Sequence, residues 1–327
     1  MNNNLEHSDN DRVGELGWGI VLCLLLLFCI SISCIYFATE QQNSIAKASK
    51  AVLMQCAWYL LGAALIAGVM KLDEEQLIRL AKIGYFFGMI LLFLVIFFYS
   101  RSYYLNTGAK SWFSFGPITF QPSEGLKPFY ILLMSRLLKE DYYQGPHASY
   151  HSDLHLLLKM SYYTVPIILM LKIINDFGTT MVYLAIFFGF LIISQCRAKF
   201  IGELILLSIA LFFILLFAAS SSGGQQFLRI FGFKTYQFSR ISSWLNPSGN
   251  TSNQSFQLWQ SIKAIGSGQF WGKGLSGPFV YVPVRESDMI FSVIGETTGF
   301  LGSSLLIMIF LYLFFLIVEC AIKSKRI

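Results

Sequence analysis

Long apolar runs separated by short polar segments dominate the chain. Because the hydrocarbon core of a bilayer is about 30 Å thick, a helix that spans it needs about 20 apolar residues. Eight segments reach or approach that length: 18–38, 52–70, 80–99, 121–138, 160–174, 178–194, 200–220 and 290–318. The pattern predicts an all-α polytopic membrane protein with about eight transmembrane helices. An even number of spans places both termini on the same side of the membrane.

The composition agrees with a lipid environment. Of the 327 residues, 55% are hydrophobic and only 13% are charged, whereas soluble domains carry about 25% charged residues. The first apolar run has no convincing cleavage site, so we do not interpret it as a signal peptide. We expect residues 1–17 to be a cytoplasmic leader and residues 18–327 to form a single transmembrane domain. The net charge of +6 is modest, and no feature points to nucleic acid.

Basic residues set the expected orientation. With the N-terminus in the cytoplasm, the inside loops hold twelve Lys and Arg residues and the short outside loops hold six. The segment 221–287 is left out of this comparison because the positive-inside rule discounts long loops. We therefore expect both termini and the loop 139–159 to be cytoplasmic. The loops 100–120 and 221–287 are then extracytoplasmic.

Both extracytoplasmic loops are rich in aromatic residues. In the first, Trp112 and two Phe residues precede a Gly116-Pro117 turn. The second carries an amphipathic helical candidate at 255–265 and a glycine-rich run at 266–277. Loops longer than about 15 residues are usually functional or disordered. The aromatic content favours a folded cap.

Ionisable residues at membrane depth are expensive and usually functional. Glu124 and Lys127 lie three residues apart at the start of the fourth apolar segment, so they share a helix face and can pair. The alternative is an interfacial ion pair that only caps the helix. Asp176 interrupts two apolar runs, and either a functional carboxylate or a helix cap accounts for it.

Asp288 is the last polar residue before the final apolar segment. It is a candidate functional carboxylate at the water–membrane boundary, or alternatively a helix N-cap. Arg285 in the preceding turn could hold an anionic group. Glu296 lies about two turns, or about 11 Å, further on, which argues against an acid/base pair with Asp288. No P-loop, nucleophile-elbow or HExxH sequence is present, and we expect no metal site built from protein ligands.

Three motifs, at 108–128, 175–180 and 236–302, together closely resemble the SEDS family of RodA-, FtsW- and SpoVE-type proteins. They read GAKSWFSFGPITFQPSEGLKP, NDFGTT and YQFSRISSWLNP through VPVRESDMIFSVIGETTGFLG. The sequence motif PVRESDMIF is most similar to RodA of low-GC Gram-positive bacteria. The resemblance extends from about residue 18 to the end.

The resemblance implies a peptidoglycan glycosyltransferase in the bacterial cytoplasmic membrane that polymerises lipid II during elongation and works with a class B penicillin-binding transpeptidase. It implies roles for residues that match family positions. Asp288 would be the general base, and substrate would be bound by Glu124, Lys127, Arg240, Trp112 and Asp176, joined by Arg285. Pyrophosphate departure needs compensating positive charge, with or without a divalent cation (Mg²⁺ or Mn²⁺).

The sequence departs from the family at two motif positions and at its end. Ser287 replaces the usual Thr and Asn175 the usual Pro. The family continues for two more helices, so we expect this chain to lack them. Two alternatives stay open: a transporter of the lipid-linked precursor, and a truncated inactive scaffold of the same machinery.

Overall fold

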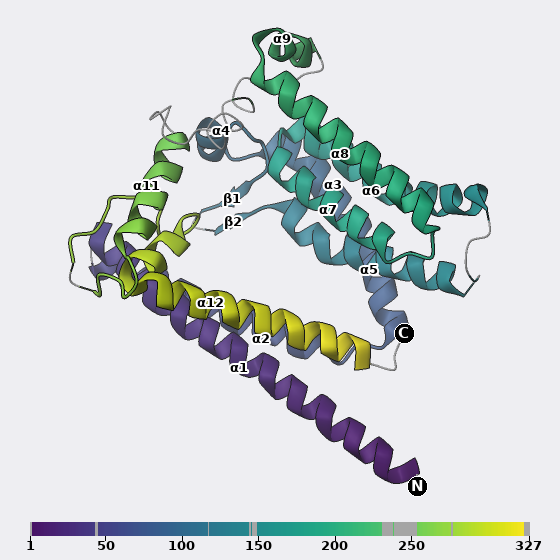
Figure 1. Ribbon diagram of the computed structural model, residues 1–327, viewed down its shortest axis with the longest axis horizontal. Helices are drawn as coiled ribbons and strands as arrows, with labels where there is room; N and C mark the ends of the chain where they lie inside the picture. Colours follow the sequence, from purple (N-terminus) through teal and green to yellow (C-terminus); the bar gives the residue numbers. More distant parts are fainter. Residues whose placement is uncertain are drawn as a thin grey trace. The chain divides into compact units, whose positions relative to one another are not determined.

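The computed structural model describes residues 2–42, 45–116, 118–143, 145, 149–230, 238, 254–275 and 277–323 (Figure 1). Its elements are α1 (Asn2–Gln42), α2 (Ile45–Val69), α3 (Glu74–Phe98), α4 (Arg101–Thr107), β1 (Phe113–Phe115), β2 (Ile118–Phe120), α5 (Pro122–Tyr142), α6 (Tyr150–Ile174), α7 (Phe177–Ile192), α8 (Ala198–Ser220), α9 (Ser222–Ile230), α11 (Gln254–Ser267) and α12 (Ile290–Lys323).

Six described helices are long and apolar enough to cross a bilayer: α1, α2, α3, α6, α8 and α12. The chain is thus an all-α multi-pass membrane protein with about six apolar spanning helices. Helices also cover the other two predicted segments. However, α7 has only 16 residues, and α5 carries six charged residues.

The segment 139–159, expected to be a cytoplasmic loop, is largely helical. Helix α5 continues to Tyr142, and α6 already begins at Tyr150. The side chain of Ser149 caps α6 by accepting a hydrogen bond from the Ser152 amide. Hydropathy did not predict the first turns of α6 because they contain polar residues. Asp153, Leu156 and Met160 nevertheless form one buried helical face.

The chain divides into two compact units, Ala67–Phe213 and Met1–Ile66 with Ile214–Ile327. In the unit 67–213, α3 packs closely on α5 because glycines face the partner helix. A Cβ at Gly84 would lie 2.5 Å from the Phe129 ring, and one at Gly88 would lie 2.6 Å from Leu126. Small residues commonly allow such close approach of membrane helices.

A short antiparallel hairpin leads into α5. Phe113 of β1 pairs with Phe120 of β2, and Gly116 turns the chain with a φ of 65°. The hairpin is tied down at its base because the Ser100 amide donates a 2.8 Å hydrogen bond to the Trp112 carbonyl. The hairpin continues directly into α5, whose first two turns carry two of the predicted site residues.

In the other unit, α1 lies alongside α12 (Figure 1). Cys23 of α1 is buried with Leu313 and Leu316 of α12. Helix α11 packs against the beginning of α12, which confirms the helix predicted at 255–265. Part of the long loop is therefore folded onto the final helix, as the aromatic content predicted.

Candidate functional site

The predicted site residues fall into both units. Trp112, Glu124, Lys127 and Asp176 belong to the unit 67–213, whereas Arg285 and Asp288 belong to the other. Arg240 lies outside the described residues.

Glu124 and Lys127 form the predicted ion pair at the start of α5. Lys127 Nζ lies 2.7 Å from Glu124 Oε1, with side-chain exposures of 20% and 52%. Pro122 occupies the first helical position, where its missing amide hydrogen costs nothing. An ion pair this exposed contributes at most about 1 kcal/mol to folding. Stability alone is therefore a weak reason for both charges to be present.

Asp176 caps α7, as one of the two readings of its position predicted. Its Oδ1 accepts a 3.1 Å hydrogen bond from the Thr179 amide. Its Oδ2 accepts a 2.7 Å hydrogen bond from Nε2 of Gln121, the residue just before α5. Sequence analysis missed Gln121 as a site residue. The contact joins the starts of α5 and α7 and makes Asp176 more than a local cap.

Trp112 is half-buried and stacks on Tyr103 of α4. The ring centroids lie 5.4 Å apart with an interplanar angle of 22°. Nearby, the Lys110 ammonium lies 4.9 Å from the centroid of Tyr99, within the range of a cation–π contact. The segment from Tyr99 to Trp112 thus presents an ordered aromatic cluster close to the start of α5.

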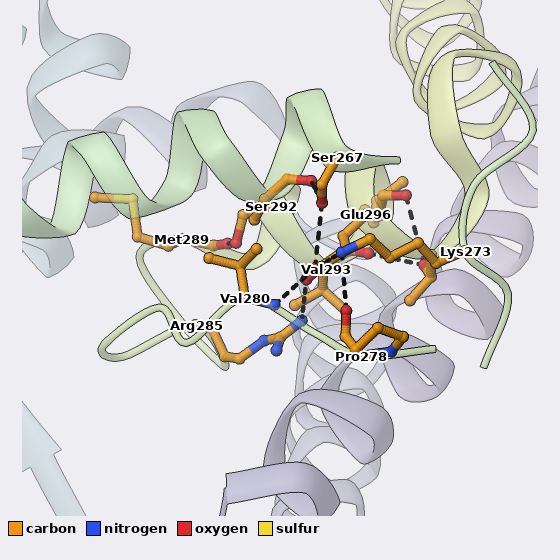
Figure 2. A network of polar contacts seen from close by, with 12 residues as sticks. Ser267, Lys273, Pro278, Val280, Arg285, Met289, Ser292, Val293 and Glu296 are labelled. Carbon is orange, nitrogen blue, oxygen red and sulfur yellow. Dashed lines mark hydrogen bonds and ion pairs between the residues drawn. The ribbon is translucent and has the colours of Figure 1, made fainter. Parts of the chain in front are cut away.

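The second group centres on Glu296, which is fully buried in α12 (Figure 2). Its Oε1 accepts hydrogen bonds from Lys273 Nζ at 2.8 Å, the Val280 amide at 2.7 Å and Ser267 Oγ at 3.3 Å. Its Oε2 lies 3.4 Å from Nη2 of Arg285. Sequence analysis noted this carboxylate only for its distance from Asp288. The signal that could have found the network is a lone acid inside an apolar helix with two nearby cations.

The glycine-rich run fits against a break in α12. Gly299 has φ 64° and ψ −157°, which interrupts the helix. The Phe300 amide then donates to the Gln269 carbonyl at 2.8 Å, and the Lys273 amide donates to the Glu296 carbonyl at 2.9 Å. A Cβ on Gly272 would lie 2.2 Å from the Thr297 carbonyl oxygen. Glycine is required here because two backbone segments touch.

Arg285 is only 2% exposed, whereas Asp288 is exposed. Burial lowers the pKa of Arg285, and the charge of Glu296 opposes that shift. The guanidinium also lies 5.8 Å from the Phe279 ring. Asp288 has no hydrogen-bond or ion-pair partner among the described residues, and α12 begins at Ile290 without a cap from it. The N-cap alternative for Asp288 is therefore wrong.

Two further features concern ligands. In the described part of the chain, no group of three or more His, Cys, Asp or Glu residues could hold a metal ion. An apolar cavity of about 320 Å³ lies between α1 and α12, with Cys29, Phe37, Leu275, Val293 and Leu305 among its lining residues.

Comparison with known proteins gives the family. A model of FtsW, RodA and SpoVE proteins, described as cell cycle protein, matches residues 15–327. The chain belongs to this family. SEDS relatives named peptidoglycan glycosyltransferase include MrdB of Helicobacter pylori strain 26695, 34% identical over 82% of this chain and 66% of its own length. Another, a putative FtsW of Mesostigma viride, is 30% identical over 84% of this chain and 61% of its own length.

The chain spans about two thirds or less of the length of these curated SEDS relatives. Solved structures share the fold. A peptidoglycan synthase complex matches with a TM-score of 0.65 and 22% identity, covering 90% of this chain and 75% of the other. RodA of Thermus thermophilus matches with a TM-score of 0.54 and 22% identity, covering 94% and 76%. The SEDS fold predicted from the three motifs is confirmed.

Proposed function

We propose that this chain acts as a peptidoglycan glycosyltransferase that polymerises lipid II, with Asp288 as general base. The observation that carries the proposal is the state of Asp288. Its carboxylate is exposed and has no partner among the described residues, yet it belongs to a turn directly before a spanning helix. A base that removes the proton of an acceptor sugar hydroxyl needs such an accessible carboxylate. The names of the relatives support the same reaction.

The remaining residues fit the charge changes of this reaction. When the donor's anomeric carbon is attacked, a lipid pyrophosphate leaves and needs compensating positive charge. Lys127 supplies one cation, held by Glu124 at 2.7 Å, and Arg240 supplies another in this proposal. A divalent cation, if bound at the pyrophosphate, would add to the same compensation. Trp112 would pack against a sugar ring, and Asp176 would bind the substrate near the membrane.

The apolar cavity between α1 and α12 suits part of the polyprenyl tail. Its volume of about 320 Å³ is small beside a whole lipid, so only a short stretch of chain fits inside. Arg285, predicted to bind an anionic group, is engaged by Glu296 in this structure. Direct contact of Arg285 with substrate would require that pair to open.

We also propose eight membrane crossings with both termini in the cytoplasm. Helix α5 has 21 residues and α7 has 16, which correspond to about 32 Å and about 24 Å. The first length matches a bilayer core of about 30 Å, and local thinning of the bilayer accommodates the second. Twelve basic residues against six in short loops support this orientation.

A class B penicillin-binding transpeptidase is the proposed partner, and cell elongation the proposed process. The first rests on the similarity to a peptidoglycan synthase complex, whose description joins polymerization with crosslinking. Cell elongation rests on the sequence of the 283–291 motif and on 34% identity to MrdB against 30% to the FtsW relative. Co-purification with the transpeptidase from the same cell tests the partner.

The deciding experiment uses the purified full chain and purified lipid II. We expect Asp288→Asn to reduce glycan polymerisation at least about 100-fold, as loss of a general base typically does, while insertion into membranes is unchanged. The matched control is Asp73→Asn at the exposed N-cap of α3, where Asn caps equally well. Polymerisation that survives Asp288→Asn rules out the proposed base. Lipid II translocation in liposomes, without polymerisation, would favour the transporter instead.

A further inference from the structure

We infer that Glu296 is a positioning residue that holds the turn of Asp288 in place through Arg285. The inference rests on the proposed function for its catalytic meaning, but its structural part stands separately. As a positioning residue, Glu296 does not touch the reacting atoms. It acts by fixing the backbone from which the Asp288 carboxylate projects.

The contacts of Glu296 reach three separate stretches of the preceding loop. Lys273 comes from the glycine-rich run, Val280 from the extended segment after it, and Arg285 from the turn that ends at α12 (Figure 2). All three converge on one carboxylate in the second turn of the helix. A single side chain therefore gathers the loop onto α12, and Arg285 is the point nearest to Asp288.

The charges make this arrangement hard to replace. Glu296 is 0% exposed and Arg285 is 2% exposed, and a buried charge is very costly unless it is paired and hydrogen-bonded. Removing the Glu296 charge would leave Arg285 buried without its carboxylate. Lys273 is 21% exposed and can turn towards water. The cost therefore falls mainly on the turn that carries Arg285 and Asp288.

The backbone of that turn is itself strained. Val284 has a φ of 54°, a left-handed conformation that is a genuine outlier for a β-branched residue. Such conformations persist only when the surrounding structure determines them. On one side Val282 is fully buried, and on the other Arg285 is fixed by Glu296. These two anchors hold the strained residue, and without the second the turn would relax and move Asp288.

Three variants test the inference by hydrogen exchange on the full chain in detergent, without substrate. Glu296→Gln keeps the size of the side chain and removes its charge. Arg285→Met leaves Glu296 paired with Lys273 and unties only the turn. Glu319→Gln is the matched control, because Glu319 is a surface acid of the same helix paired with Lys323 at 2.5 Å.

We expect Glu296→Gln to speed exchange at least about 10-fold across residues 267–289. Arg285→Met should do so only across 282–289, and Glu319→Gln in neither segment. Unchanged exchange at 282–289 in Arg285→Met overturns the inference. An equal increase at 267–281 and 282–289 in that same variant overturns it as well. If Glu296→Gln does not fold, the Arg285→Met comparison still decides, because Glu296 keeps three donors there.

Lipid II polymerisation provides the catalytic readout. We expect Glu296→Gln to lower kcat at least about 10-fold with KM changed less than about 3-fold, and Glu296→Asp to recover part of the loss. A purely structural role would lower the active fraction without a change in the pH profile of kcat, whereas a displaced base shifts that profile. If the unmodified chain fails to polymerise lipid II, the proposed function fails, and the exchange results still judge the role of Glu296.

Discussion

Gln121 donates a 2.7 Å hydrogen bond from its side-chain amide to Oδ2 of Asp176. The two residues lie 55 positions apart in the sequence, at the starts of α5 and α7. Tyr183 strengthens the same junction, because its hydroxyl donates a 2.8 Å hydrogen bond to the Ser123 carbonyl. The Glu124–Lys127 pair thus stands on a helix start that is fixed to its neighbour.

The first prediction concerns this junction. Gln121→Met should lower the free energy of unfolding by about 1.5–3 kcal/mol, because a hydrogen bond to a charged group is lost. Gln121→Glu should cost more, since two carboxylates would then face each other. Unfolding in a detergent titration measures both. A control is Gln76→Met, which removes the exposed side-chain contact to the Asp73 amide; equal losses at both positions would contradict the prediction.

The second prediction separates stability from activity at Lys127. Lys127→Met should change the free energy of unfolding by less than about 1 kcal/mol, as expected for an exposed ion pair. Polymerisation of lipid II should nevertheless fall at least about 10-fold, because the leaving pyrophosphate loses a compensating cation. Lys323→Met, which breaks the comparable pair with Glu319, should leave both quantities nearly unchanged. Full activity of Lys127→Met would remove this residue from the proposed mechanism.

The third prediction concerns Gly299. Gly299→Ala should destabilise the fold by at least about 2 kcal/mol, because its φ and ψ belong to a region open essentially to glycine alone. The added Cβ would also lie 2.3 Å from the Gly272 nitrogen. Gly62→Ala in α2 is the control, since a Cβ there meets nothing within 4 Å and alanine favours the helix. The thermal unfolding midpoint should fall for the first variant and not for the second.

The fourth prediction concerns Cys196, between α7 and α8. Burial raises the pKa of its thiol, and the nearby Asp153 carboxylate acts in the same direction. A raised pKa means less thiolate at a given pH, so alkylation should be slow at pH 8 and its midpoint should lie above the ordinary value of 9.0. The rate is measured from pH 7 to 10 with the other five cysteines replaced by Ser. The same chain unfolded in SDS should show the ordinary midpoint.

Sequence patterns predicted the features that depend on local spacing. The apolar runs located the spanning helices, the i, i+3 spacing placed Lys127 beside Glu124, and a polar break before an apolar run located the Asp176 cap. The same reasoning failed where polar residues continue a helix, as in the first turns of α6. It could not find contacts between distant segments, such as Gln121 with Asp176 or Glu296 with Lys273. Those depend on packing, which hydropathy does not report.

The break at Gly299 also determines how much of the last helix needs to lie in lipid. At about 1.5 Å per residue, the 34 residues of α12 make about 51 Å of helix when the parts before and after the break are added, well beyond a hydrocarbon core of about 30 Å. The part after the break is long enough to cross the bilayer unaided. The part before it, with Glu296, can therefore lie outside the hydrocarbon core, where the folded loop surrounds it. Protein dipoles and cations then stabilise the charge of Glu296. The membrane thickness does not constrain the turn of Asp288.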